Sequence, residues 1–334
     1  MPEIRQNRLT GEWVIIAPER AKRGTNLARP PEPSEIPTHL ATCPFCPGNE
    51  GGLEDERYRV NDEHGNWVLR SVVNKFSVLS PTGDVAPPVC APAGEASVNG
   101  VGLHEVLLET RAHHLTLAQV SVEQVQRVLE AYRDRFLAFC ADPRIKHVIL
   151  FKNHGADAGA SQQHPHSQIV GLPIVPGQVV DRLHRSRKFF AQTGQCLACT
   201  LIAQEREQQS RILAETPGYI AFIPYAALSP YHVWIFPKAH TPCFSESPRE
   251  DLPELAAIVR KILAKLFGLL GNPAFNLVVR SLIPHEDDTA HFHWYISIVP
   301  RVVKVAGFEL GTGMYVNPSA PEVSAQALRD FREG

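Results

Sequence analysis

The chain has 334 residues, of which 44% are hydrophobic and 20% are charged, and its formal net charge at pH 7 is -2. This balance is typical of a soluble globular protein. Because the net charge is slightly negative, we do not expect non-specific binding to nucleic acid or to an anionic membrane. Apolar runs all fall short of the roughly 18 residues that a membrane-spanning helix needs, and the first residues lack the pattern of a secretory signal. The cytoplasm is therefore the expected location.

Strands and two long helices are predicted along the chain. The helices, over 121–140 and from about Pro248 to Leu269, have apolar residues at helical spacing. Ser121 and Gln124 form the signature of a capping box at the start of the first helix. Segments rich in β-branched and aromatic residues predict strands at 13–16, 106–108, 147–151, 233–236, 276–279 and 294–299.

The two halves of the chain present the same order of features. Each half has a Cys-x-x-Cys pair, a strand ending near a histidine, a helix, another strand and a His-x-His pair. The spacing from His113 to His164 equals that from His240 to His291. This internal repeat predicts two similar α+β units, 1–174 and 175–334.

The first Cys-x-x-Cys pair, Cys43 and Cys46, lies in a turn that contains proline and glycine. Zinc prefers four thiolate and imidazole ligands in a tetrahedral set, and His113 and His164 could complete such a set. The alternative is a redox pair, which fits poorly because neither Cys-x-x-Cys pair is expected to open a helix in a βαβ pattern. We therefore predict a zinc site here.

A second metal site is predicted in the other half. Cys196, Cys199 and His240 supply three ligands, and either His291 or His293 supplies the fourth. The repeat spacing favours His291. We expect this site to be structural.

The run from Gly155 to Gln168 predicts the reacting residue. Its small residues let the backbone approach a phosphate closely. In an extended segment His164, His166 and Gln168 share one face. Neutral imidazole can attack phosphorus and form a covalent adduct, and an amide can hydrogen-bond the same phosphate. We predict that His166 is the nucleophile and that Gln168 assists it; a strand that only binds or supports a metal is the alternative.

A short basic run, Arg20-Ala21-Lys22-Arg23, follows the strand at 13–16. Arginine suits bidentate recognition of phosphate. Taken alone, however, such a run is more often a solvated turn.

Taken together, these motifs resemble the galactose-1-phosphate uridylyltransferase family, a branch of the histidine-triad superfamily, over nearly the whole chain. The opening segments 7–14 and 18–23 are similar to those of the family, whose two arginines contact substrate phosphate, and Cys43-Pro44-Phe45-Cys46 is similar to its zinc loop. The resemblance implies an α+β fold of two fused histidine-triad-like halves, each an antiparallel sheet with helices packed on it. The substrate-binding residues that it implies are Arg20, Arg23, Asn74, Asn153, Ser161, Phe308 and Glu309.

The sequence also departs from the better-known uridylyltransferases. Ser167 stands where they carry glycine, and Phe308 replaces the tyrosine of a Tyr-Glu pair that meets the sugar phosphate. The second Cys-x-x-Cys pair and the ending at 307–318 look more like a sister branch that includes ADP-glucose phosphorylase. In that branch the residue similar to His293 is a zinc ligand, which favours His293 over His291.

The resemblance implies a ping-pong nucleotidyltransferase that acts on a nucleotide sugar and a sugar 1-phosphate in galactose metabolism. UDP-glucose is the expected donor and galactose 1-phosphate the expected acceptor. An ADP-sugar phosphorylase using inorganic phosphate is the close alternative. A non-catalytic nucleotide-sugar-binding module and a hydrolase of the histidine-triad type are alternatives of other classes. A homodimer is expected from the resemblance alone.

Overall fold

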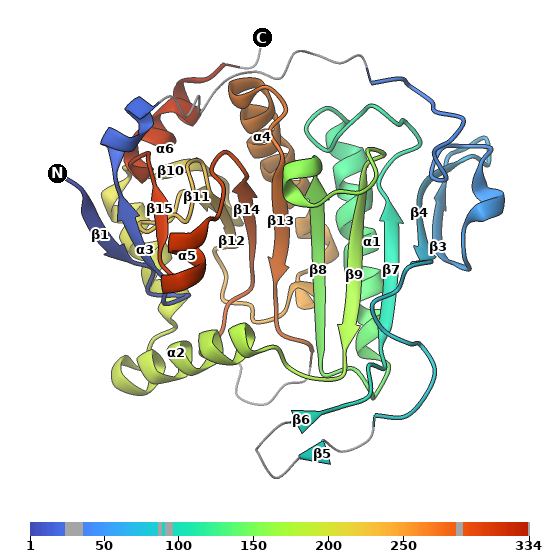
Figure 1. Cartoon of the computed structure of the whole chain (residues 1–334), viewed down its shortest axis with the longest axis horizontal. Coiled ribbons are helices and arrows are strands. Elements are labelled where there is room, and N and C mark those ends of the chain that lie inside the picture. The colour runs from blue at the N-terminus through green and yellow to red at the C-terminus, as the bar shows by residue number, and fades with distance from the viewer. Residues whose placement is uncertain (24–35, 86–88, 91–95, 285–289, 333–334) are drawn as a thin grey trace.

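A ten-stranded sheet forms the centre of the protein, with strand order β10-β11-β12-β14-β13-β8-β9-β7-β4-β3 (Figure 1). The computed structural model describes residues 1–23, 36–85, 89–90, 96–284 and 290–332. The strands of the sheet are β3 (Glu56–Asn61), β4 (Trp67–Val73), β7 (Leu103–Leu108), β8 (His147–His154), β9 (His166–Leu172), β10 (Ile212–Glu215), β11 (Tyr219–Phe222), β12 (Val233–Pro237), β13 (Phe275–Arg280) and β14 (Tyr295–Pro300).

The sheet consists of two similar halves. Every ladder within it is antiparallel. Reading outward from the centre, the order β8-β9-β7-β4-β3 of the first half matches the order β13-β14-β12-β11-β10 of the second. β8 and β13 pair with each other and join the halves into one sheet. The predicted α+β fold with two antiparallel halves is therefore confirmed.

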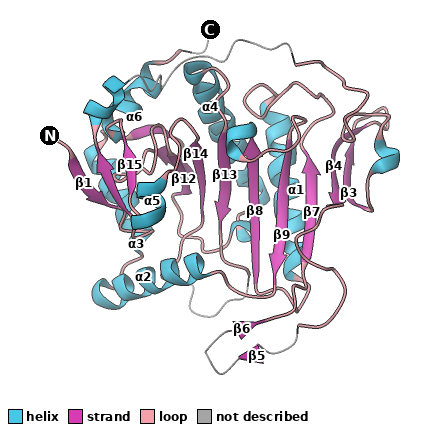
Figure 2. Ribbon diagram, viewed as in Figure 1, coloured by secondary structure: helices cyan, strands magenta, loops and turns pink. Residues whose placement is uncertain are grey.

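Two long helices cover one face of the sheet, one for each half (Figures 1 and 2). α1 (Val122–Cys140) begins where predicted, because the Ser121 hydroxyl accepts a hydrogen bond from the Gln124 backbone N–H at 3.2 Å. α4 (Leu252–Leu270) begins later than the predicted Pro248. Pro248 itself is extended, with ψ of 141°, and a short 3-10 turn at Arg249–Asp251 precedes the helix. α1 and α4 bury their apolar faces in one hydrophobic core that spans both halves.

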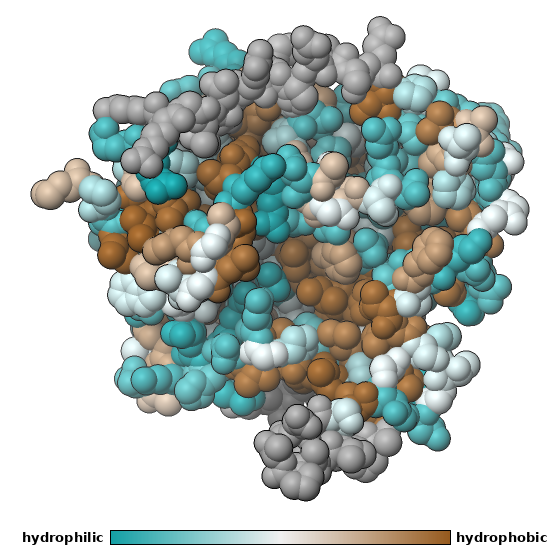
Figure 3. Space-filling model, in the orientation of Figure 1, coloured by the Kyte–Doolittle hydropathy of each residue, from teal (hydrophilic) through white to brown (hydrophobic). Residues whose placement is uncertain are grey.

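The opposite face of the sheet is covered differently in the two halves. α2 (Gly177–Thr193), α3 (Leu197–Gln208) and a three-stranded sheet of β1 (Glu3–Gln6), β2 (Trp13–Ile16) and β15 (Tyr315–Asn317) lie on the side of the second half. α3 buries a separate cluster of aromatic residues there. In the first half the loop around Phe45 and Leu53 packs on β4 and β7 instead. The centre of this face is left hollow, with apolar residues visible in the hollow (Figure 3).

The remaining elements are short. They are the 3-10 helices η1 (Pro18–Arg23), η2 (Glu50–Gly52), η3 (Ala156–Ala158), η4 (Phe244–Glu246) and η5 (Arg249–Asp251), the two-residue strands β5 (Val89–Cys90) and β6 (Ala96–Ser97), and the helices α5 (Gly307–Thr312) and α6 (Pro321–Asp330). None of the helices within the described residues is long and apolar enough to cross a membrane.

Candidate active site and metal clusters

The first cluster brings together the four ligands predicted in the first half. Donor atoms of Cys43, Cys46, His113 and His164 lie within 4.8 Å of one another, and all four residues are buried. The Cys46 Sγ lies 3.3 Å from the His113 Nδ1 and 3.6 Å from the His164 Nδ1. The His164 Nε2 donates a hydrogen bond to the Thr110 carbonyl at 2.8 Å. The proton therefore sits on Nε2, and the Nδ1 lone pair faces the thiols, which is the orientation that a metal ligand needs.

The second cluster repeats this arrangement. Donor atoms of Cys196, Cys199, His240 and His293 also lie within 4.8 Å of one another. The Cys199 Sγ is 3.4 Å from Nδ1 of both histidines, and the His293 Nε2 donates to the Pro237 carbonyl at 2.9 Å. The second cluster is more open than the first, because His240 is exposed.

Two details of the second cluster differ from what the repeat suggested. His293, and not His291, faces the two thiols, and the His291 Nε2 instead lies 3.2 Å from Nε of Arg187. The second half has two more residues than the first between its two cluster histidines, which equal spacing could not reveal. The second Cys-x-x-Cys pair does open a helix, because Cys196 is the N-cap of α3. That helix follows α2 rather than a strand, so the pair still lacks the βαβ setting of a redox motif.

His166 is the first residue of β9 and is 5% exposed. Its Nδ1 lies 2.8 Å from the His164 carbonyl oxygen. A carbonyl can only accept, so the proton is on Nδ1 and the lone pair is on Nε2. Burial, and then the charge of Lys152, lower the pKa of His166, which keeps the ring neutral. The Phe45 ring from the first cysteine loop lies 5.5 Å from the His166 ring and limits its movement.

A buried polar network lies on the other face of the sheet, behind His166. The Lys152 Nζ forms an ion pair with Glu109 at 2.8 Å and donates to the His166 carbonyl at 3.0 Å. The side chains of Lys152 and Glu109 are 1% and 0% exposed. The Ser167 hydroxyl donates to Glu109 and also bonds the Tyr132 hydroxyl. These two hydrogen bonds explain why a residue with a hydroxyl group occupies position 167.

Gln168 is held by a histidine on the neighbouring strand β7. The Val78 backbone N–H donates to Nδ1 of His104 at 3.3 Å, so the ring proton is on Nε2. That Nε2 lies 2.9 Å from Oε1 of Gln168, to which it donates. The Asn74 amide nitrogen lies 3.0 Å from the same Nε2, but because both atoms carry protons it is not the acceptor of this N–H. With Oε1 occupied, the Gln168 amide nitrogen has no hydrogen bond to another described residue. It can donate to a phosphate oxygen.

Asn153 and Ser161 frame the loop that leads to His166. Asn153 lies on β8 and its Oδ1 accepts a hydrogen bond from Asn276 at 2.8 Å. Ser161 is exposed in the bend before His164. Between them, Gly155 and Gly159 have φ of 79° and 85°, which side chains rarely adopt. The loop can therefore place backbone N–H groups close to a ligand.

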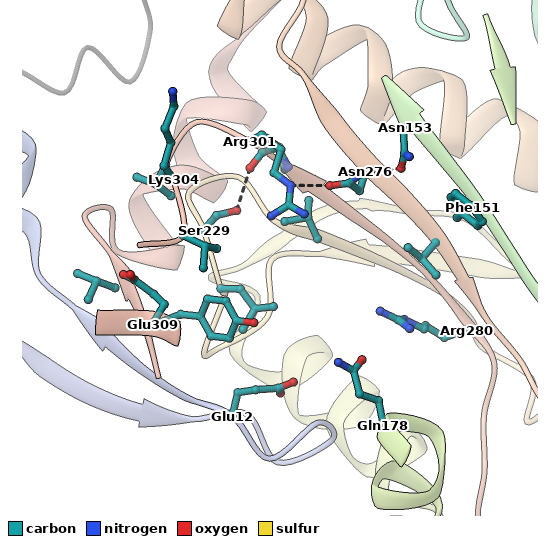
Figure 4. A pocket seen from close by; sticks show the side chains of 18 of the residues that line it. Glu12, Phe151, Asn153, Gln178, Ser229, Asn276, Arg280, Arg301, Lys304 and Glu309 are labelled. Carbon is teal, nitrogen blue, oxygen red and sulfur yellow. Dashed lines mark hydrogen bonds between the residues drawn. The ribbon is translucent and has the colours of Figure 1, made fainter. Parts of the chain in front are cut away.

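The other predicted substrate residues lie elsewhere. η1, which carries Arg20 and Arg23, and α5, which carries Phe308 and Glu309, lie on the side of the second half, away from β9 (Figure 1). Arg20 is exposed, whereas the side chain of Arg23 lies outside the described part of the structure. One chain does not bring these residues together with His166. Asn153 and Glu309 do line one cavity, from different sides (Figure 4).

Lys152, Glu109 and His104 were not identified from the sequence. Each is a polar residue within a strand that also contains an apolar run, or directly after such a strand, and that position was the available signal. Only the cross-strand pairing shows what each of them contacts.

Comparison with known proteins places the chain in a class. Two family models match consecutive parts of it: galactose-1-phosphate uridyl transferase, N-terminal domain, over residues 1–176, and the C-terminal domain over residues 182–333. Together with the fold and the His166 strand, these matches define a nucleotidyltransferase. The chain belongs to the galactose-1-phosphate uridyl transferase family, whose members act on nucleotide sugars and sugar phosphates. The resemblance found in the sequence is thereby confirmed.

Individual relatives come from two branches. An ADP-glucose phosphorylase of Arabidopsis thaliana is 33% identical over 98% of this chain and 93% of its own length. The galactose-1-phosphate uridylyltransferase of Thermotoga maritima is 29% identical over 99% and 98%. A crystal structure of the Arabidopsis ADP-glucose phosphorylase with bound ADP-glucose is similar with a TM-score of 0.84 and 31% identity, covering 99% of both chains. A uridylyltransferase structure is similar with a TM-score of 0.74 and 25% identity, covering 98% and 97%.

Proposed function

We propose that the protein transfers a nucleotidyl group from a nucleoside diphosphate sugar through a covalent adduct on His166. The observation that carries this proposal is the hydrogen bond from His166 Nδ1 to the His164 carbonyl, which leaves the lone pair on Nε2. Nε2 attacks the α-phosphorus, the bond from that phosphorus to the bridging oxygen breaks, and the sugar 1-phosphate leaves. A phosphate oxygen of the acceptor then attacks the same phosphorus. The N–P bond breaks, and neutral His166 is regenerated.

The neighbouring residues position and stabilise the transferred group. The Gln168 amide nitrogen, whose orientation is set by His104, donates to a non-bridging oxygen as negative charge develops. Asn153 and Ser161 contact the nucleotide from the loop side, and Asn74 contacts the nucleoside.

We propose zinc as the ion of both Cys-His clusters, because two thiolates and two imidazoles make its preferred donor set. The ion of the first cluster would hold His164, and therefore the carbonyl that orients His166. The ion of the second cluster would hold the start of α3 against the sheet. Thiols that bind zinc must stay reduced, which suits a cytoplasmic location.

Two donors are candidates. ADP-glucose with inorganic phosphate as acceptor is favoured by the similarity to ADP-glucose phosphorylase in both sequence and structure. UDP-glucose with galactose 1-phosphate is favoured by the family models and by the Thermotoga relative. We propose the ADP-sugar reaction first and the uridylyl reaction, which was the expectation from the family resemblance, as the second candidate.

Product analysis separates these reactions. Purified protein is incubated with each donor, with each acceptor and without any acceptor, and the nucleotides are separated by chromatography. ADP and glucose 1-phosphate formed from ADP-glucose and phosphate support the first candidate, whereas UDP-galactose formed from UDP-glucose and galactose 1-phosphate supports the second. Rapid donor consumption without acceptor indicates a hydrolase. A protein that converts neither donor under any of these conditions contradicts the proposed function.

We further propose that the active unit is a homodimer in which a second copy supplies Arg20, Arg23, Phe308 and Glu309. The supporting observation is that these residues lie away from His166 within one chain. His166→Ala and Glu309→Gln are each expected to be inactive. Random reassociation of the two should restore about a quarter of the wild-type activity, because about half of the dimers then hold one intact site. No recovery would show that one chain supplies the whole site.

The division into 1–174 and 175–334 is also retained as a proposal. The two family models support it, because they meet between residues 176 and 182.

A further inference from the structure

A cavity of about 510 Å³ lies on the hollow face of the sheet, between α2, β8, β13 and the segment after β14 (Figure 4). This size suits a small organic ligand. Among the described residues, four basic and two acidic ones line it. The basic residues are Arg182, Arg280, Arg301 and Lys304, and the acidic residues are Glu12 and Glu309.

Arg182 and Arg280 lie together at the α2 end of the cavity. Arg182 is 7% exposed, and its Nε is buried without a hydrogen-bond partner. The hydrogen bond that its guanidinium makes, from Nη1 to the Gln178 carbonyl, is long at 3.4 Å. Arg280 points from β13 into the cavity, and its side chain makes no hydrogen bond or ion pair with another described residue (Figure 4).

Two guanidinium groups without a paired carboxylate are costly in a partly desolvated cavity. Burial, and then the nearby charge of Arg182, lower the pKa of Arg280. Glu12 lines the same cavity, but its Oε2 is also buried without a hydrogen-bond partner. The group that would satisfy the arginines is therefore a ligand with at least one negative charge.

This end of the cavity is separate from the reacting histidine. Asn153 on β8 and Asn276 on β13 are direct cross-strand partners in the row of the sheet that leads to His166. Arg280 lies four residues further along β13. Glu309, on another side of the cavity, has its carboxylate engaged by the Ala306 backbone N–H at 2.9 Å.

We propose that Arg182 and Arg280 form a binding site for the phosphate of a small phosphorylated molecule, in addition to the site of nucleotidyl transfer. Two guanidinium groups offer paired N–H donors that match phosphate oxygens. A phosphomonoester also carries about -1.5 to -2 charges at pH 7, enough to balance both arginines beside Glu12. The sugar or other organic part would lie along the apolar floor formed by Ile149, Phe151 and Val278.

The experiment is calorimetric titration of the His166→Ala protein, in which the proposed adduct cannot form. The probes are glucose 1-phosphate and inorganic phosphate, with sodium chloride at the same ionic strength as the salt control. Saturable binding of at least one phosphorylated probe is expected. Arg280→Gln and Arg182→Gln in the same background should each weaken it about tenfold or more. Lys261→Gln, an exposed charge on α4, is the matched control and should bind as the parent does.

A second measurement keeps this inference apart from the proposed function. Arg280→Gln, with His166 intact, should form the nucleotidyl adduct as the wild type does. Equal affinity of the variant and parent proteins, or no binding of either probe by the parent, overturns the inference. Loss of the adduct in folded Arg280→Gln also overturns it, because the arginines would then serve the transfer site itself. Failure of every protein to form an adduct would refute the proposed function but leave the binding result decisive.

Discussion

Tyr295 occupies in the second half of the sheet the position that His166 occupies in the first. Each residue opens its strand, β14 or β9, and each follows by two residues a cluster histidine that donates to a backbone carbonyl. Tyr295 is 2% exposed and its ring stacks on Phe236 with centroids 4.8 Å apart, whereas the His166 ring is tilted against Phe45 with centroids 5.5 Å apart. The second half therefore keeps the metal-cluster geometry but has an aromatic core in place of a nucleophile.

The two clusters are predicted to bind one zinc ion each and to differ in function. Elemental analysis should give about two zinc ions per chain. Cys43→Ser should lose one ion together with adduct formation, because the first cluster holds the strand that orients His166. Cys196→Ser should lose one ion but retain the adduct. Cys243→Ser, a buried cysteine outside both clusters, is the control and should keep both ions. Retention of two ions in Cys43→Ser would argue against the first assignment.

Lys152→Met is predicted to destabilise the fold. It leaves the Glu109 carboxylate buried without its cation, which costs about 3–5 kcal/mol in comparable cases. The double variant Lys152→Met/Glu109→Gln should recover most of that loss, because glutamine is neutral and can still bond Ser167 and Tyr132. Urea denaturation of the two single variants and the double variant measures the coupling. If the losses in free energy of unfolding of the two single variants add up to that of the double variant, the interaction between Lys152 and Glu109 does not contribute to stability.

His104→Phe is predicted to slow transfer while leaving substrate binding nearly unchanged. The ring volume is kept, but Gln168 loses the hydrogen bond that orients its amide. One such bond corresponds to about fivefold to tenfold in kcat. Steady-state kinetics should show this loss in kcat rather than in KM. In a Gln168→Ala background the same change should have almost no effect; an equally large effect there would mean that His104 acts independently of Gln168.

His232 is predicted to make the fold acid-sensitive. Burial, and then the charge of Arg280, lower the pKa of His232 to about 3, against about 6.5 in the unfolded chain. The unfolded state therefore binds the extra proton first. Because of His232 alone, the free energy of unfolding should fall by about 1.4 kcal/mol per pH unit as the pH drops from about 6.5 towards 3. Urea titrations of wild type and His232→Gln at pH 6, 5 and 4 measure the difference in slope. Parallel slopes would contradict the shift.

The features that could be predicted from the sequence are those that depend on patterns of residues close together in the chain. Helical periodicity and the Ser121 cap define α1, and the paired Cys-x-x-Cys motifs with their histidines define the first cluster and three ligands of the second. The start of α4 could not be placed, because Pro248 is compatible with a first helical turn and also with the extended backbone that it adopts.

Other features depend on contacts between distant segments. Strand pairing places Lys152 beside Glu109 and His104 beside Gln168, and no spacing along the chain indicates either pair. The choice between His291 and His293 depended on an insertion of two residues that the repeat concealed. Likewise, Arg182 lies on α2 and Arg280 on β13, and only the folded chain brings these two arginines to the same cavity.

Covalent transfer through His166 is tested most directly by mass spectrometry of the metal-loaded protein after incubation with ADP-glucose or UDP-glucose in the absence of acceptor. We expect a gain of one nucleotidyl group per chain, mapped to the peptide containing His166. The gain should be unchanged in Tyr295→Phe and absent from His166→Ala of equal metal content. An adduct that persists in His166→Ala, or no adduct with either donor, would contradict it.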